Sequence, residues 1–251
     1  MFKAYMYKTL RSPLTLIGIF GVFALCCTHF FSDILFSNDM VTHISFFLDV
    51  DAYRKAIALF AALPFTANFA AEWQSGVTRY CVIRDGSKKY AISNGLFCAG
   101  TSFLTVFIGI MLFAGVFSFW ITFYKPDPNP KGLPFGVLLD NGLPWLYLII
   151  KVFIFSCSVS MWCVMGMFFS AFFPNKYVAL CSPLVASYVI ERITINFPDA
   201  ANLWYLSLSV LNWTDPWLSF LYITGVFTAL SAALVTAFYF VLIKKVQNET
   251  T

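Results

Sequence analysis

The charged side chains best suited to binding chemistry lie in residues 72–89 (EWQSGVTRYCVIRDGSKK), between two long apolar runs. Only 11% of the chain is charged, so a concentration of charge in one short segment is unusual for it. A short basic segment between apolar runs is typical of a cytoplasmic loop that docks a partner. The charged residues of this segment are Glu72, Arg79, Arg84, Asp85, Lys88 and Lys89.

Sequence patterns for metal or phosphate chemistry are absent from the chain. His29 and His43 are its two histidines, and neither belongs to an HExxH zinc-binding pattern. No G-x-x-x-x-G-K-[ST] nucleotide-binding loop occurs. The seven cysteines form no CxxC pair, and most lie in or beside apolar runs, which predicts reduced, buried thiols. We therefore expect no catalytic residue, no metal site and no cofactor in this chain.

The composition predicts an integral membrane protein. Of the 251 residues, 60% are hydrophobic and 20% aromatic, whereas soluble domains are about half apolar and about a quarter charged. The net charge of +4 is small and dispersed among apolar runs, so we expect no nucleic-acid partner. The expected fold class is an all-α, polytopic protein of the cell membrane, surrounded by the lipid bilayer.

Six membrane-spanning helices are predicted within a single domain, residues 1–251, because each crossing needs about 20 mostly apolar residues. The fifth is the weakest, since its apolar run ends at Ile190 and reaches a full crossing only if it continues to Phe197. The aromatic stretch after it predicts short outer helices before the last span. The predicted spans are residues 12–32, 54–71, 90–124, 146–173, 177–197 and 216–243.

The positions of lysine and arginine predict the orientation. With both termini in the cytoplasm, ten of the sixteen basic residues lie on the cytoplasmic side, as the positive-inside rule requires. Residues 1–11 (MFKAYMYKTLR) do not resemble a cleavable signal. Their apolar residues recur at helical spacing, which predicts an interfacial helix, although a plain basic anchor fits equally well.

Local patterns predict the structure of the loop at 72–89. Thr78–Arg84 is long enough for about two helical turns, and in the turn predicted at residues 85–87 Gly86 frees the backbone. Ser87 can cap the helix that follows. Glu72 lies at the end of the second span, where the helix dipole disfavours an acid. We therefore expect it to have a basic partner, for which Arg79, Lys88 and Lys89 are in reach.

The same loop resembles the segment between spans two and three of ABC-2 family permeases. The shared pattern is E-x-x-x-G-x-T-R followed by G-S-K-x-x-x-x-S-N. The chain departs from the family where Val77 separates Gly76 from Thr78, where Ser87 directly follows Gly86, and where Lys88 replaces the usual arginine. The matching residues are Glu72, Gly76, Thr78, Arg79, Gly86, Ser87, Lys88, Ser93 and Asn94.

The resemblance implies a permease subunit of an ATP-driven transporter. Such a permease works with a separate cytoplasmic ABC ATPase, which binds the ATP, and with a second copy of itself or a sister permease. Export of a hydrophobic or amphipathic substrate is implied, with no substrate site identified. The helix Thr78–Asp85 would be the coupling helix. The implied ATPase-coupling residues are Glu72, Gly76, Thr78, Arg79, Tyr80, Ile83, Arg84, Gly86, Ser87 and Lys88.

Other functions are compatible with the sequence. They are a non-transporting accessory or immunity protein, a substrate-binding subunit of an energy-coupling transporter, and an intramembrane enzyme. Lys151, Glu191 and Arg192 are expected near the outer surface, and the lack of a deeper charge argues against ion-coupled transport. Small residues in LIGIFG (residues 16–21) and SCSVSMWCVMG (156–166) predict close helix packing, within the chain or between copies.

Overall fold

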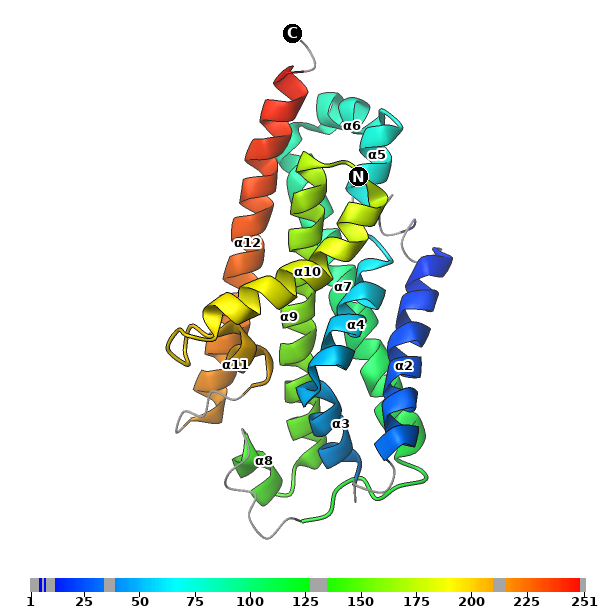
Figure 1. Cartoon of the computed structure of the whole chain (residues 1–251), viewed down its shortest axis with the longest axis vertical. Helices are drawn as coiled ribbons and strands as arrows, with labels where there is room; N and C mark the ends of the chain where they lie inside the picture. The colour runs from blue at the N-terminus through cyan, green and yellow to red at the C-terminus, as the bar shows by residue number, and fades with distance from the viewer. Residues whose placement is uncertain are drawn as a thin grey trace.

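The computed structural model describes Tyr5, Tyr7 and residues 12–33, 39–126, 135–209 and 215–248, and every regular element in these parts is an α-helix. The helices form one elongated bundle (Figure 1). Four are long and apolar enough to cross a membrane, as predicted for an all-α, membrane-embedded protein. They are α2 (Pro13–Asp33), α7 (Ser87–Phe117), α9 (Pro144–Phe172) and α12 (Pro216–Asn248).

These four helices coincide with the predicted spans at 12–32, 90–124, 146–173 and 216–243. α7 ends seven residues before the predicted end at residue 124. Beyond it the chain pairs with the start of α3 (Met40–Asp49), where the backbone N–H groups of Met40 and Val41 donate to the carbonyls of Thr122 and Phe123 at 3.1 and 3.2 Å. The sequence did not predict α3.

The predicted second span, residues 54–71, is not one continuous helix. It is divided into α4 (Asp51–Ala62) and α5 (Asn68–Gln74), with turns at residues 63–67. Pro64 lies in this break, where its missing N–H and its ring prevent a regular helix. Pro64 therefore accounts for the interruption between α4 and α5.

The predicted fifth span, residues 177–197, corresponds to α10 (Lys176–Thr194), which slants across the bundle in Figure 1. The side chain of Asn175 caps its first turn by accepting from the N–H of Tyr177 at 2.9 Å. α10 carries charge near both ends and is not among the four helices that meet the criteria for a span. A short helix, α11 (Leu203–Ser207), precedes α12 as predicted, whereas α8 (Gly136–Asp140) was not predicted.

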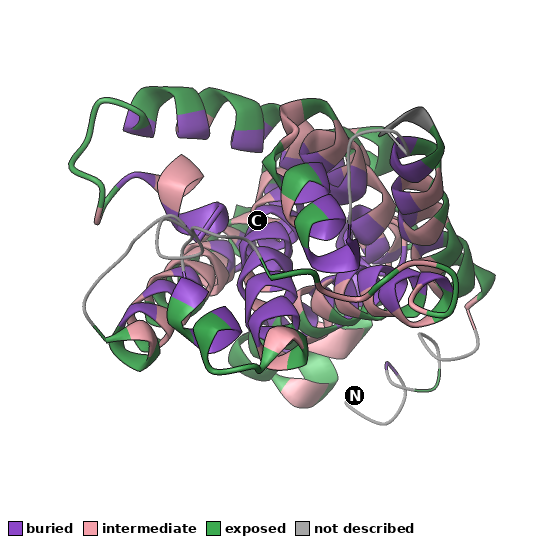
Figure 2. Cartoon of the chain, turned by 90° about the horizontal axis from the view of Figure 1, so that it is seen from below, coloured by how far each residue is buried: buried purple, intermediate pink, exposed green. Residues whose placement is uncertain are grey.

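α9 is the central helix of the bundle. In the most apolar stretch of α9, 78% of the residues are buried. The corresponding value is 17% for α12, which lies at the edge of the bundle. Figure 2 shows buried residues gathered along the middle of the bundle and exposed ones on its outer faces. Glycines permit the close packing: a Cβ on Gly21 would meet Phe60 at 2.2 Å, and one on Gly166 would meet the carbonyl of Ala179 at 2.8 Å. Both glycines pack helices of the same chain together.

The two ends of the bundle carry different elements (Figure 1). One end holds α5, α6 (Val77–Asp85), the start of α7 and the end of α12. The opposite end holds α3, α8 and the start of α9. Of the predicted interfacial helix at 1–11, only Tyr5 and Tyr7 are described, both in helical conformation, and the rest lies outside the described residues.

Candidate docking surface

α6 is a short surface helix bounded by two glycines. Gly76 and Gly86 have φ angles of 73° and 83°, in a region that residues with a Cβ rarely adopt. No atom lies within 4 Å of a Cβ built on either glycine, so the backbone conformation, rather than space, requires glycine there. The predicted helix at Thr78–Asp85 is confirmed. The predicted cap is wrong, because Gly86 is the N-cap of α7 and Ser87 is its first residue, with no side-chain capping bond.

The outward face of α6 combines apolar and basic side chains. Tyr80 and Ile83 are 77% and 82% exposed, and Arg79 and Arg84 are exposed as well. Arg84 forms an exposed ion pair with Asp85, with Nη2 and Oδ2 3.0 Å apart. Its hydrogen bond and charge lower the pKa of Asp85 and raise that of Arg84. Large exposed apolar groups rimmed by charge are typical of protein-binding surfaces.

A hollow of about 620 Å³ opens between the end of α5 and α6. The residues that line it include Trp73, Gly76, Thr78, Arg79, Tyr80 and Ile83. Four of the coupling residues predicted on α6 therefore share one concave surface with the end of α5: Thr78, Arg79, Tyr80 and Ile83.

Glu72 connects this surface to the interior of the bundle. Its buried carboxylate accepts hydrogen bonds from the Tyr5 hydroxyl at 2.9 Å, the Tyr90 hydroxyl at 2.8 Å and the Asn68 amide at 2.8 Å. Burial and the charge of Glu72 raise the pKa of Tyr5, so its phenol remains a donor. Asn94 extends the network, donating to the Tyr5 hydroxyl at 3.2 Å.

The printed hydrogen bonds of Glu72 come from neutral donors, and the basic partner expected for it stays a prediction. The proposed partners Lys88 and Lys89 are exposed in the first turn of α7, whereas the carboxylate is buried. Neutral donors can hold a buried carboxylate in place, because several hydrogen bonds to one charged group favour its charged form. Sequence reasoning missed Tyr5 and Tyr90 because aromatic residues are common throughout this chain.

The structure divides the predicted coupling residues into two groups. Glu72 and Thr78 are buried where α5, α6 and α7 meet, and so is Asn94 from the family pattern. The exposed group contains Arg79, Tyr80, Ile83, Arg84 and Lys88. Ser87 belongs to neither group, because it is partly buried. Gly76 and Gly86 set the direction of α6 through their backbone conformation.

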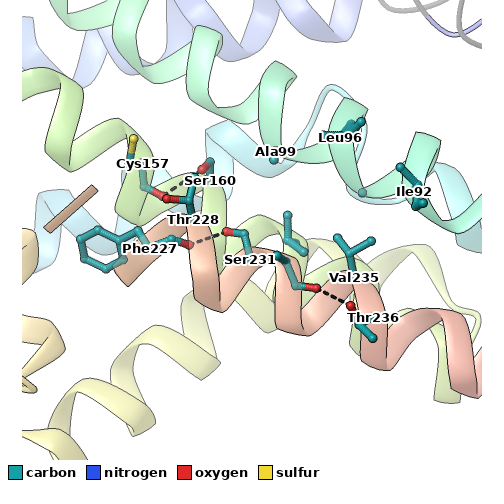
Figure 3. Close-up of a pocket in the computed structure, with 13 residues that line it drawn as sticks. Ile92, Leu96, Ala99, Cys157, Ser160, Phe227, Thr228, Ser231, Val235 and Thr236 are labelled. Atoms are coloured by element: carbon teal, nitrogen blue, oxygen red, sulfur yellow. Dashed lines mark hydrogen bonds between the residues drawn. The ribbon is translucent and has the colours of Figure 1, made fainter. Parts of the chain in front are cut away.

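A lateral groove of about 520 Å³ lies between α7, α9 and α12 (Figure 3). Ser160, Ser231 and Thr236 line it, but each hydroxyl donates at 2.8 Å to a carbonyl of its own helix. Thr228 does the same with the carbonyl of Thr224. Because these hydroxyls are already paired, the groove presents a mainly apolar surface.

Several charged side chains are buried among other residues of the protein. Lys151 and Glu191, expected near the outer surface of the membrane, are two of them. Arg54, on α4, is buried as well. Burial inside the protein does not measure depth in the membrane, so the expected lack of a deep intramembrane charge stays a prediction.

The buried histidines were not recognised as a pair. Nδ1 of His29 lies 3.3 Å from Nε2 of His43, within an aromatic cluster. No group of three or more His, Cys, Asp or Glu side chains that could hold a metal ion occurs among the residues that the structure describes. All seven cysteines are free thiols.

Comparison with known proteins gives no relative. No family model matches the chain, and no curated protein or solved structure matches it either.

Proposed function

We propose that this chain is the permease subunit of an ATP-driven transporter of the ABC-2 type, with α6 as its coupling helix. The observation that carries the proposal is the placement of α6, a surface helix whose exposed face combines Tyr80 and Ile83 with Arg79 and Arg84. Two large apolar side chains flanked by two cations fit a groove with an apolar floor and an acidic rim on a separate ATPase subunit.

The inner face of α6 supports a mechanical role. Thr78 lies 3.4 Å from the Tyr90 hydroxyl of α7, and Tyr90 in turn donates to Glu72 of α5. A push on α6 would therefore move the ends of two bundle helices together. Transmission of this kind needs a packed or hydrogen-bonded chain of contacts, and the Thr78–Tyr90–Glu72 chain is one.

Six crossings remain part of this proposal. The four long helices account for four of them. α4 and α5, interrupted at Pro64, would together make the second crossing, and the slanting α10 the fifth. The α6 surface and the C-terminal end of α12 then lie on the cytoplasmic side, and the start of α12 lies on the outer side. Both termini are cytoplasmic, as the positive-inside rule predicts.

The lateral groove between α7, α9 and α12 suits a hydrophobic or amphipathic substrate, or its tail, entering from the bilayer. A second permease copy would complete the pathway, and the sparsely buried α12 offers a face for it. ATP would be bound by the partner alone.

The test is affinity purification of the tagged chain from its native membrane in a mild detergent, with mass spectrometry of the proteins that accompany it. An ABC ATPase is expected in stoichiometric amount. A chain that purifies without any ATPase, while remaining folded, would contradict the proposal and favour an accessory or immunity protein.

A further inference from the structure

A buried cluster of charges joins α4, α10 and α11, away from the α6 surface. One carboxylate oxygen of Glu191 on α10 accepts a hydrogen bond from Arg54 Nη2 at 3.3 Å. The other accepts one from Lys55 Nζ at 2.5 Å. Arg54 Nη2 also donates to the Ser207 hydroxyl of α11 at 2.5 Å. Lys55 lies 3.7 Å from Asp51, one turn earlier on α4. Two cations therefore share one buried carboxylate.

Arg54 has hydrogen-bonding capacity that the described residues do not use. Its side chain is 3% exposed, and Nε and Nη1 have no hydrogen-bond partner among the described residues. A buried donor without an acceptor is costly, and more so on a charged group. The guanidinium therefore favours an acceptor from outside the protein, and an anionic oxygen would be the strongest one.

Space for such an acceptor lies beside the cluster. A small void of about 10 Å³ adjoins Arg54, enough for roughly one oxygen-sized group. It shares Lys55 and Glu191 with a larger hollow of about 240 Å³. Arg192 and Trp204 line that larger hollow. The guanidinium of Arg192 is exposed and lies 5.6 Å from the centre of the Tyr188 ring, so it adds a cation at the mouth.

The surface beside the hollow is apolar. Val185, Tyr188 and Val189 of α10 are about half exposed and continue from the mouth along the outer side of the helix. Exposed valine and tyrosine at this position suit contact with hydrocarbon, while Tyr188 and Trp204 suit the boundary between hydrocarbon and water. A ligand held here would combine an anionic head in the hollow with an apolar tail along α10.

We propose that the hollow beside Arg54, Lys55 and Arg192 binds the phosphate group of a phospholipid-like amphiphile. The phosphate oxygens would accept from Lys55 and Arg192 at the mouth and reach toward the unpaired N–H groups of Arg54. Asp51 and Glu191 restrict the site, because they repel a headgroup with several negative charges. The site does not depend on the ATPase-docking role of α6, since it lies on other helices.

The proposal is tested by calorimetric titration of the purified full-length chain in a non-ionic detergent and a phosphate-free buffer. The probe is dioctanoylphosphatidylglycerol, and dioctanoylglycerol, with the same tails and no phosphate, is its matched control. Saturable binding of the phospholipid is expected, with the phosphate-free lipid at least about tenfold weaker, since charge-assisted hydrogen bonds are strong. Equal binding of the two lipids, or no binding of either, overturns the proposal.

Variants locate the site. Arg192→Gln and Arg54→Gln should each weaken phospholipid binding about tenfold, whereas Arg84→Gln, an exposed arginine on α6, should leave it unchanged. Arg192 is exposed, so its variant remains informative if Arg54→Gln fails to fold. Binding unaffected by Arg192→Gln would contradict the assignment. Titration with inorganic phosphate alone distinguishes the two possible origins of the bound phosphate group. Tight binding would support a soluble phosphate ligand at the same site, and weak binding would support a lipid headgroup.

Discussion

The hydroxyl of Thr78 on α6 lies 3.4 Å from the hydroxyl of Tyr90 on α7. Because the Tyr90 phenol donates its single proton to Glu72 at 2.8 Å, Thr78 is the donor in the first contact. The two bonds form a directional chain from the surface helix, through the start of α7, to the end of α5. All three groups are buried, so water does not compete for these bonds.

Removal of the Tyr90 hydroxyl should interrupt this chain of hydrogen bonds while the buried aromatic ring stays in place. Tyr90→Phe is expected to cost about 1 kcal/mol of stability, because Glu72 keeps Tyr5 and Asn68 as donors. If α6 transmits motion, the variant should still bind its ATPase while substrate-stimulated ATP hydrolysis falls. Thermal unfolding in detergent and ATPase assays of the reconstituted complex measure the two effects.

The control for this variant is Tyr222→Phe, which removes a hydroxyl that donates to the Ala200 carbonyl at 2.9 Å on the far side of the bundle. A similar loss of stability with normal hydrolysis is expected. Equal loss of hydrolysis in both variants would show that stability, and not coupling through Tyr90, governs activity.

Gly86 should be sensitive to substitution although nothing crowds it. With φ 83° and ψ 145°, Gly86 adopts a backbone conformation close to the region that essentially only glycine populates, so alanine there is unfavourable by about 1–3 kcal/mol. Gly86→Ala is therefore expected to reorient α6 and weaken ATPase association. Gly100→Ala is the matched control, since Gly100 is exposed in the middle of α7 with open space around it, and alanine there should stabilise by up to about 1 kcal/mol. Association reduced equally by both changes would argue against a role for the Gly86 bend.

The two ends of the bundle should face opposite sides of the membrane. Cysteines placed at Lys89 and at Asn141 are both at exposed positions, one beside α6 and one beside α8. In a background without native cysteines, a membrane-impermeant thiol reagent applied to intact cells is expected to label position 141 only. Labelling of both positions, or of position 89 alone, contradicts the orientation.

Local features of the loop were predictable from the sequence. Gly76 and Gly86 fix backbone turns that glycine alone adopts easily, and they define α6 without help from the rest of the fold. The break at Pro64 follows equally from one residue. The long apolar runs identified α2, α7, α9 and α12 because hydrophobic length is a property of a single segment.

Partners distant in sequence were not predictable. Tyr5 reaches Glu72 across 67 positions, and Arg54 reaches Glu191 across 137. Nothing in the local pattern of either acid indicates these donors. Charge placement alone therefore indicated neither the tyrosine donors of Glu72 nor the buried ion pair of Arg54 with Glu191, because both depend on tertiary packing.

The most direct test of the docking role is the amount of ATPase that co-purifies with a double charge reversal on α6. Arg79→Glu with Arg84→Glu should abolish ATPase association while the protein still inserts and unfolds at the wild-type temperature. Lys176→Glu with Lys244→Glu reverses two exposed cations at the same end of the bundle, and should keep the ATPase. An ATPase retained by the α6 variant at the wild-type ratio would contradict the assignment of α6 as the coupling helix.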